Sequence, residues 1–160
     1  MSVSPAFIVA PVLGSYFITY AIGARKYDFY RQAWFQPPGW VFGVVWTLLY
    51  VMLGAILWKS FDVSDWETFG LTWGLVGMTY LWPYIFNVRR DFKMSIYLVV
   101  AILTLALILY VQLYYSKLVD EDSFGKGYLM VYVPLLAWLI FALILATQSH
   151  DMSQRKRVKP

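Results

Sequence analysis

The chain has 160 residues, of which 61% are hydrophobic, 20% are aromatic and only 14% are charged, and its net charge is +4. Soluble domains carry about 25% charged residues, and a chain this short has too little interior to hide so much apolar surface from water. The composition therefore excludes an ordinary soluble domain and indicates lipid as the solvent, while the absence of cysteine excludes disulfides and thiolate metal sites.

Five apolar segments follow one another along the chain, at residues 5–24, 40–58, 69–88, 94–115 and 128–147. Each has 19 to 22 residues and contains no Asp, Glu, Lys or Arg. A helix needs about 20 apolar residues to cross a hydrocarbon core of about 30 Å, whereas the strands of a membrane barrel alternate over about 10 residues. The pattern predicts an all-α membrane protein, a single bundle of five transmembrane helices over residues 1–160.

The first segment, residues 5–24, could also be a cleaved signal peptide. No basic residue precedes it, and its apolar run exceeds the about 7–15 residues of a signal-peptide core. We therefore expect a retained helix, with Pro5 and Pro11 in its first turns. Pro83 and Pro134 lie deeper in the third and fifth segments and predict local bends there.

The basic residues gather on one side of the predicted membrane. Ten of the thirteen follow the first, third and fifth segments, namely Arg25, Lys26, Arg31, Arg89, Arg90, Lys93, Arg155, Lys156, Arg157 and Lys159. The positive-inside rule then places the loop 25–39 and the basic tail 148–160 in the cytosol, and the N-terminus outside. A basic tail is also typical of nucleic-acid binding. Beside a membrane helix it favours topology or anionic-lipid contact, so the expected partners include lipid and no nucleic acid.

Groups for chemistry are scarce within the five segments. Ionisable residues inside a membrane are the usual mark of ion paths, proton relays and retinal attachment, and the segments hold none. The single histidine, His150, follows the last segment. We predict no catalytic residue, no metal and no cofactor, which argues against a pump, a rhodopsin-like photoreceptor and a hydrolase.

Two tryptophans lie away from the ends of their segments. Tryptophans of membrane proteins usually gather at the interfaces, as Trp58 does. Trp46 and Trp138 lie about a third to halfway along their segments, where an indole N–H prefers a partner. Tyr50 and Ala142 follow them by four residues and share their helix faces. These residues either fill the bundle core or form the wall of a pocket for a flat, largely apolar ligand.

The run 34–50, WFQPPGWVFGVVWTLLY, is the most distinctive motif. Its aromatic-x-Pro-Pro loop and its G-x-x-W-x-x-L-Y helix resemble the signature of the tryptophan-rich sensory protein / translocator protein family (TspO/MBR, the peripheral benzodiazepine receptor family). Two further matches follow in order, the WP pair at 82–83 and the run PLLAW at 134–138. The resemblance covers nearly the whole chain.

This resemblance implies a compact bundle of five helices, usually a homodimer, with a pocket among helices one, two and five under a lid formed by the loop 25–39. Members of the family bind porphyrins such as protoporphyrin IX, sterols, and synthetic benzodiazepine or isoquinoline ligands. The ligand-binding positions carried over to this chain are Trp46, Tyr50, Ala137, Trp138 and Ala142, with Phe35, Gln36 and Pro37 in the lid.

Several polar positions depart from the family pattern. Thr79 stands where the third helix commonly carries Asn, and Leu98 where the fourth often carries Asp. The end of the fifth segment reads LATQSHD at 145–151 in place of a Leu-Asn-Tyr-x-x-Trp-Arg pattern, so the Tyr of the family's sterol-recognition motif is missing. The ligand preference of this chain is therefore left open.

Three glycines in the third segment bear on association. Gly70, Gly74 and Gly77 place small residues along one helix face, which lets another helix approach closely. That helix could belong to the same bundle or to a second copy of the chain. The family resemblance favours the second copy, a homodimer.

Three functions are compatible with these features. The first is a receptor or translocator that binds porphyrin-like or sterol-like ligands, and the second is an enzyme that promotes light-dependent porphyrin breakdown through Trp46 and Trp138. The third is a membrane scaffold without a specific ligand. We expect the first, because the sequence offers no general acid, base, metal or cofactor site.

Overall fold

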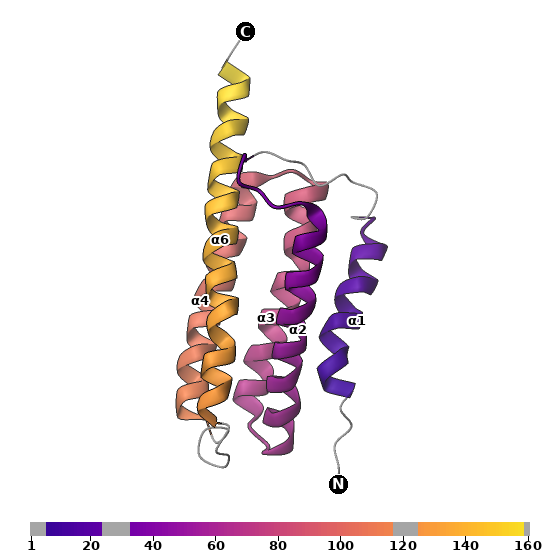
Figure 1. The fold of residues 1–160 in the computed structure, drawn as a ribbon, viewed down its shortest axis with the longest axis vertical. Coiled ribbons are helices and arrows are strands. Elements are labelled where there is room, and N and C mark those ends of the chain that lie inside the picture. Colours follow the sequence, from indigo (N-terminus) through magenta and orange to yellow (C-terminus); the bar gives the residue numbers. More distant parts are fainter. Residues whose placement is uncertain (1–5, 24–32, 117–124, 159–160) are drawn as a thin grey trace.

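The computed structural model describes residues 6–23, 33–116 and 125–158, and in these it is all-helical, without strands. Five α-helices lie side by side along one long axis (Figure 1). They are α1 (Ala6–Ala21), α2 (Gly39–Asp62), α3 (Trp66–Pro83), α4 (Phe92–Tyr115) and α6 (Gly125–Val158), with a π-helical turn, η2 (Tyr84–Val88), after α3. The prediction of an all-α bundle of five helices is confirmed.

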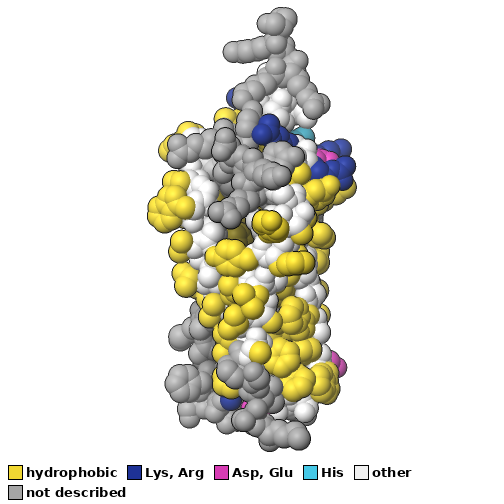
Figure 2. All heavy atoms as spheres, turned by 90° about the vertical axis from the view of Figure 1, so that its right-hand side faces the viewer, with side chains coloured by type: hydrophobic (Ala, Val, Ile, Leu, Met, Phe, Trp, Pro, Cys, Tyr) yellow, Lys and Arg dark blue, Asp and Glu magenta, His cyan; other side chains and the backbone are white. Residues whose placement is uncertain are grey.

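The outer surface of the bundle is apolar. Phe17 is 71% exposed and Leu13 is 63% exposed, whereas Thr72 and Thr79 are buried and donate hydrogen bonds to carbonyls of their own helix. Figure 2 shows a broad band of apolar side chains, with charged side chains gathered above it and few visible below it. By length and composition, three described helices can cross a membrane: α2, α4 and the part of α6 at Tyr132–Arg155.

The two ends of the bundle differ in charge. The connection from η2 to α4 carries Arg89 and Arg90, the first turn of α4 adds Lys93, and this is the end from which α6 rises alone (Figure 1). Helix α2 ends in Asp62, and the connection from α2 to α3, which carries Asp65, lies at the opposite end. Because α1 begins near this acidic end, the first and last described helices have their outer ends on opposite sides of the bundle.

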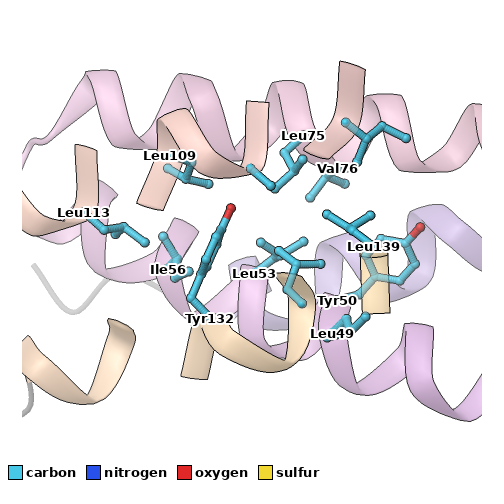
Figure 3. Close-up of a cluster of buried hydrophobic side chains, with 13 residues drawn as sticks. Leu49, Tyr50, Leu53, Ile56, Leu75, Val76, Leu109, Leu113, Tyr132 and Leu139 are labelled. Atoms are coloured by element: carbon cyan, nitrogen blue, oxygen red, sulfur yellow. The ribbon is translucent and has the colours of Figure 1, made fainter. Parts of the chain in front are cut away.

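The half of the bundle nearer the α2–α3 connection has an aliphatic core. Leu53, Ile56, Leu75 and Leu109 are almost completely buried there, with the ring of Tyr132 among them (Figure 3). Among the residues that the structure describes, the Tyr132 hydroxyl has no hydrogen-bond partner. We call this part of the molecule the aliphatic half.

Close contacts hold α1 in place along its first turns. A Cβ atom at Gly54 of α2 would lie 2.8 Å from the carbonyl carbon of Ile8, so glycine is required for this approach. The hydroxyl of Tyr80 on α3 donates to the carbonyl oxygen of Pro11 over 2.6 Å, passing beside Gly14. The N-terminal part of α1 is therefore fixed to both α2 and α3.

The helix ends differ from the predicted boundaries for identifiable reasons. The helix α3 begins three residues earlier than predicted because the Asp65 carboxylate accepts hydrogen bonds from the amide and hydroxyl of Thr68. The helix α4 begins at Phe92 because Asp91 accepts from the amide of Met94. After Pro83 the chain continues as the π-helical turn, and α6 continues through the predicted tail to Val158.

Candidate ligand-binding site

A cavity of about 220 Å³ lies between α1, α2 and the α3–η2 junction. Helix α2 contributes the stripe Phe42, Trp46 and Tyr50, in which each residue follows the previous one by four and so lies on the same face. The other walls include Ser15, Tyr16 and Thr19 from α1, and Trp82, Pro83 and Asn87 from the α3–η2 junction. The lining is mainly apolar, with several aromatic rings and a few hydroxyl and amide groups, as is usual for small-molecule sites.

The aromatic rings on α2 have fixed orientations. The Trp46 and Tyr50 rings stack with centroids 5.5 Å apart and an interplanar angle of 28°. The Tyr50 hydroxyl donates to the Thr79 hydroxyl over 3.2 Å, and Thr79 donates to the Val76 carbonyl over 2.7 Å. Thr79, which stands at the family's Asn position, therefore engages the polar end of Tyr50 and leaves its ring to line the cavity.

The indole of Trp138 on α6 belongs to a continuous group of rings. It meets Phe42 edge-on at 5.2 Å and stacks on Phe141 at 5.1 Å. Phe42 in turn stacks on Trp82 at 6.1 Å, and Trp82 stacks on Phe86 at 4.8 Å. Phe42 thus joins the wall of the cavity to the ring group on α6, and we call this part of the molecule the aromatic half.

Three indole N–H groups of the aromatic half lack hydrogen-bond partners. The Nε1 atoms of Trp46, Trp82 and Trp138 are buried and make no hydrogen bond in the part of the chain that the structure describes. An unsatisfied buried donor costs about 1–3 kcal/mol. The carboxamide oxygen of Asn87, also at the cavity, is likewise buried without a partner.

The predicted lid is only partly within the described residues. Residues 24–32 lie outside them, whereas a turn at Ala33–Gln36 is closed by the Gln36 amide donating to the Ala33 carbonyl over 3.1 Å. Gln36 is buried and Pro37 is half-buried. Phe35 reaches Phe141 of α6, with centroids 6.3 Å apart.

The predicted ligand-binding residues occupy three places. Trp46 and Tyr50 line the cavity. Trp138 and the buried Ala142 lie in the aromatic half on α6, joined to the cavity through Phe42. Ala137 is exposed on α6. The cavity is bounded by α1, α2 and the α3–η2 junction, whereas the resemblance implied helices one, two and five.

Two residues of the cavity wall, Phe42 and Trp82, are not among the predicted site residues. Phe42 lies one turn before Trp46 on the helix face that Trp46 and Tyr50 share, so extending the spacing of four backwards along α2 predicts it. Trp82 was noted as part of a motif without a position in space. The contribution of α1 has no local sequence signal, because it depends on how α1 packs beside α2.

The three glycines of α3 face outwards. All three are exposed, and a Cβ atom at Gly70 or Gly77 would meet nothing within 4 Å. At Gly74 it would meet only a Leu105 methyl, at 3.8 Å. Among the described residues, Leu105 of α4 is thus the one neighbour that this strip meets within 4 Å, and the homodimer stays a prediction.

Two comparisons with known proteins identify what this chain is similar to. The model of the TspO/MBR family matches residues 4–150. The tryptophan-rich protein TspO of Archaeoglobus fulgidus is 24% identical over 132 residues, which cover 81% of this chain and 80% of that protein. The family match therefore spans the first four helices, the aromatic half and α6 as far as His150.

Proposed function

The chain belongs to the TspO/MBR family, and on this premise we propose that it binds porphyrin-like or sterol-like apolar ligands in its aromatic half and regulates their transport or a stress response. The family and the apolar helices point to an integral membrane protein. The proposed role is that of a receptor or translocator.

The observation that carries this proposal is the grouping of aromatic rings beside a cavity. Trp46 and Tyr50 present stacked rings to the cavity, and Trp138 lies beyond Phe42. Flat ligands are held by offset stacking and edge contacts with such rings. The unpartnered indole N–H groups could donate to acceptor groups on the ligand.

The size of the cavity limits what fits without rearrangement. At about 220 Å³ it is smaller than the about 300–1,000 Å³ of typical ligand pockets. A tetrapyrrole therefore requires the aromatic half to open, and the proposal includes such an opening.

A titration with protoporphyrin IX, followed by quenching of tryptophan fluorescence, tests the proposal. Loss of one stacking ring costs about 0.5–1.5 kcal/mol beyond the lost contact area. Trp46→Ala and Trp138→Ala should therefore each weaken binding at least about tenfold. Trp66→Ala is the matched control, because Trp66 is exposed at the opposite end of the bundle and should leave affinity unchanged.

Other outcomes would select the competing functions. Equal affinities in the wild type and both pocket variants, with all proteins folded, would reject the site and favour a scaffold. A light-dependent loss of porphyrin absorbance that needs both tryptophans and yields a defined product would favour an enzyme.

We further propose a homodimer formed through the exposed glycine strip of α3. Replacing Gly70 and Gly74 together by Leu should separate the protomers in mild detergent, measured by light scattering, while the monomer stays helical. Ala101→Leu adds bulk to the exposed face of α4 and serves as the control. A double variant that still runs as a dimer would move the interface elsewhere.

The proposed orientation has the N-terminus outside and the C-terminus in the cytosol. The native chain has no cysteine, so single cysteines at Ser2 and Ser153 can be labelled from either side. The proposal requires position 2 to react from outside and position 153 from the cytosol, and the reverse pattern would overturn it.

A further inference from the structure

We propose that Phe42 is a removable plug whose ring fills the place of a flat aromatic ligand bearing hydrogen-bond acceptors, against Trp82 and Trp138. The ligand enters when the Phe42 ring moves into the adjoining cavity. This inference rests on the proposed function and names the residue that controls access to the site.

The contacts of Phe42 are those that a ligand ring would make. Its ring lies nearly parallel to Trp82, with an interplanar angle of 16°, and meets Trp138 edge-on with an angle of 64°. The side chain is 5% exposed. A third ring, that of Phe141, lies tilted at 43° with its centroid 6.4 Å away. Stacked and edge contacts are the preferred arrangements of aromatic groups.

The neighbouring polar groups are not satisfied while Phe42 fills this place. Phe42 contacts Trp82 and Trp138 directly and lies one helical turn from Trp46, and all three indole N–H groups are buried without partners. A phenyl ring carries no acceptor oxygen or nitrogen for them. A ring system with carbonyl or carboxylate groups at its edge would provide acceptors and remove this cost.

The cavity beside Phe42 provides space for a second position of its ring. Phe42 lines the cavity of about 220 Å³, and an apolar cavity of about 150 Å³ is large enough to bind benzene. In a helix a phenylalanine side chain has two accessible χ1 values, near 180° and −60°. A rotation between them redirects the ring without disturbing the helix.

The cavity wall next to Phe42 gives room for this movement. Apart from its own stretch of helix, no described residue comes within 4 Å of the position where a Cβ of Gly43 would lie. On the far side of Gly43 a shallow groove follows the outer seam of α1 and α2 and shares Tyr16, Gly43 and Thr47 with the cavity. Across this seam the Tyr16 and Thr47 hydroxyls lie 3.5 Å apart, at the outer limit of a hydrogen bond.

The first measurement needs no ligand. With 4-fluorophenylalanine placed at position 42, fluorine NMR exchange experiments should detect a second ring position with a population of about 0.1–10%, as is typical of minor conformations. The same probe at Phe86, which is 1% exposed and stacks on Trp82, should report a single environment. A single environment at position 42 would overturn the plug.

The second measurement is a protoporphyrin IX titration of the wild type, Phe42→Ala and Phe86→Ala. If the open position is populated at about 10% or less, removing the plug should tighten apparent binding about tenfold or more and speed association. Phe86→Ala removes an equal ring from the same group and should not tighten binding. Saturation should also shift the indole N–H resonances of Trp46, Trp82 and Trp138.

The possible results separate this inference from the proposed function. If the wild type binds protoporphyrin IX and folded Phe42→Ala binds it equally or more weakly, the plug is overturned and the proposed function is left intact. If no variant binds protoporphyrin IX but position 42 alone exchanges, the plug is supported and porphyrin is rejected as its ligand.

Discussion

The aliphatic and aromatic halves of the bundle differ in the side chains that they bury and in how completely these fill the interior. In the aliphatic half, branched side chains such as Leu53, Ile56 and Leu75 are buried to 1% exposure or less, and Gly54 lets α1 approach the backbone of α2. In the aromatic half, large flat rings leave a cavity and three unpartnered indole N–H groups. The first half is suited to holding the helices in register, and the second to changing its shape around a ligand.

The largest effect should come from emptying the aliphatic half. Leu109 is completely buried on α4, and Leu109→Ala should lower the free energy of unfolding by about 2–5 kcal/mol. Trp46→Ala, beside an existing cavity, should lower it less while reducing ligand affinity. Thermal unfolding in detergent, run with binding titrations, compares the two. A greater loss of stability for Trp46→Ala would reverse the roles assigned to the halves.

Gly54→Ala should produce the next largest loss of stability. The added methyl would lie 2.8 Å from the Ile8 carbonyl carbon, so α1 must shift. Overpacking of this kind costs about 1–3 kcal/mol, offset in part by the about 1 kcal/mol that alanine gains over glycine in a helix. The melting temperature in detergent measures the difference. An unchanged value would mean that α1 is not fixed at this point.

Replacing two buried tyrosines by phenylalanine should change the free energy of unfolding in opposite directions. Tyr132 leaves a hydroxyl unsatisfied in the aliphatic half, so Tyr132→Phe should raise the free energy of unfolding by about 1–3 kcal/mol. Tyr50→Phe removes the hydrogen bond to Thr79 and should lower it by about 0.5–1.5 kcal/mol. Each change removes one oxygen atom, so each variant is the control for the other in the same denaturation series. A loss of stability for Tyr132→Phe would show that its hydroxyl has a partner.

The smallest effect is expected at Gly77. A methyl group there meets nothing within 4 Å, so Gly77→Ala should change the stability of the monomer by no more than the about 1 kcal/mol of helix propensity. Measured beside Gly54→Ala, it gives the baseline for adding one methyl group to a helix. A loss as large as that of Gly54→Ala would place a neighbour against this face.

The central parts of the helices were predictable because each apolar segment lacks Asp, Glu, Lys and Arg. The ends were less so, since they depend on capping and on polar helical turns rather than on hydropathy. Asp65 and Asp91 were readable as caps, whereas the continuation of α6 through residues 148–158 carries no apolar signal.

The site was predictable along one helix and not between helices. The spacing of four between Trp46 and Tyr50 follows from helix geometry and placed both residues correctly on one face. The contact of Phe42 with Trp138 and the packing of Tyr80 against Pro11 join helices far apart in sequence. Such contacts depend on helix tilt and rotation, which are set by the whole bundle and have no local pattern.

Helix α6 is long enough to extend well beyond the rest of the bundle. Its 34 residues span about 51 Å at 1.5 Å per residue, against a hydrocarbon core of about 30 Å, and the helix rises above the other elements at one end of the bundle (Figure 1). Trp138 lies on the part of α6 that packs in the aromatic half. By simple geometry, a small tilt of α6 there would be amplified into a larger sideways displacement of the helix end at Val158.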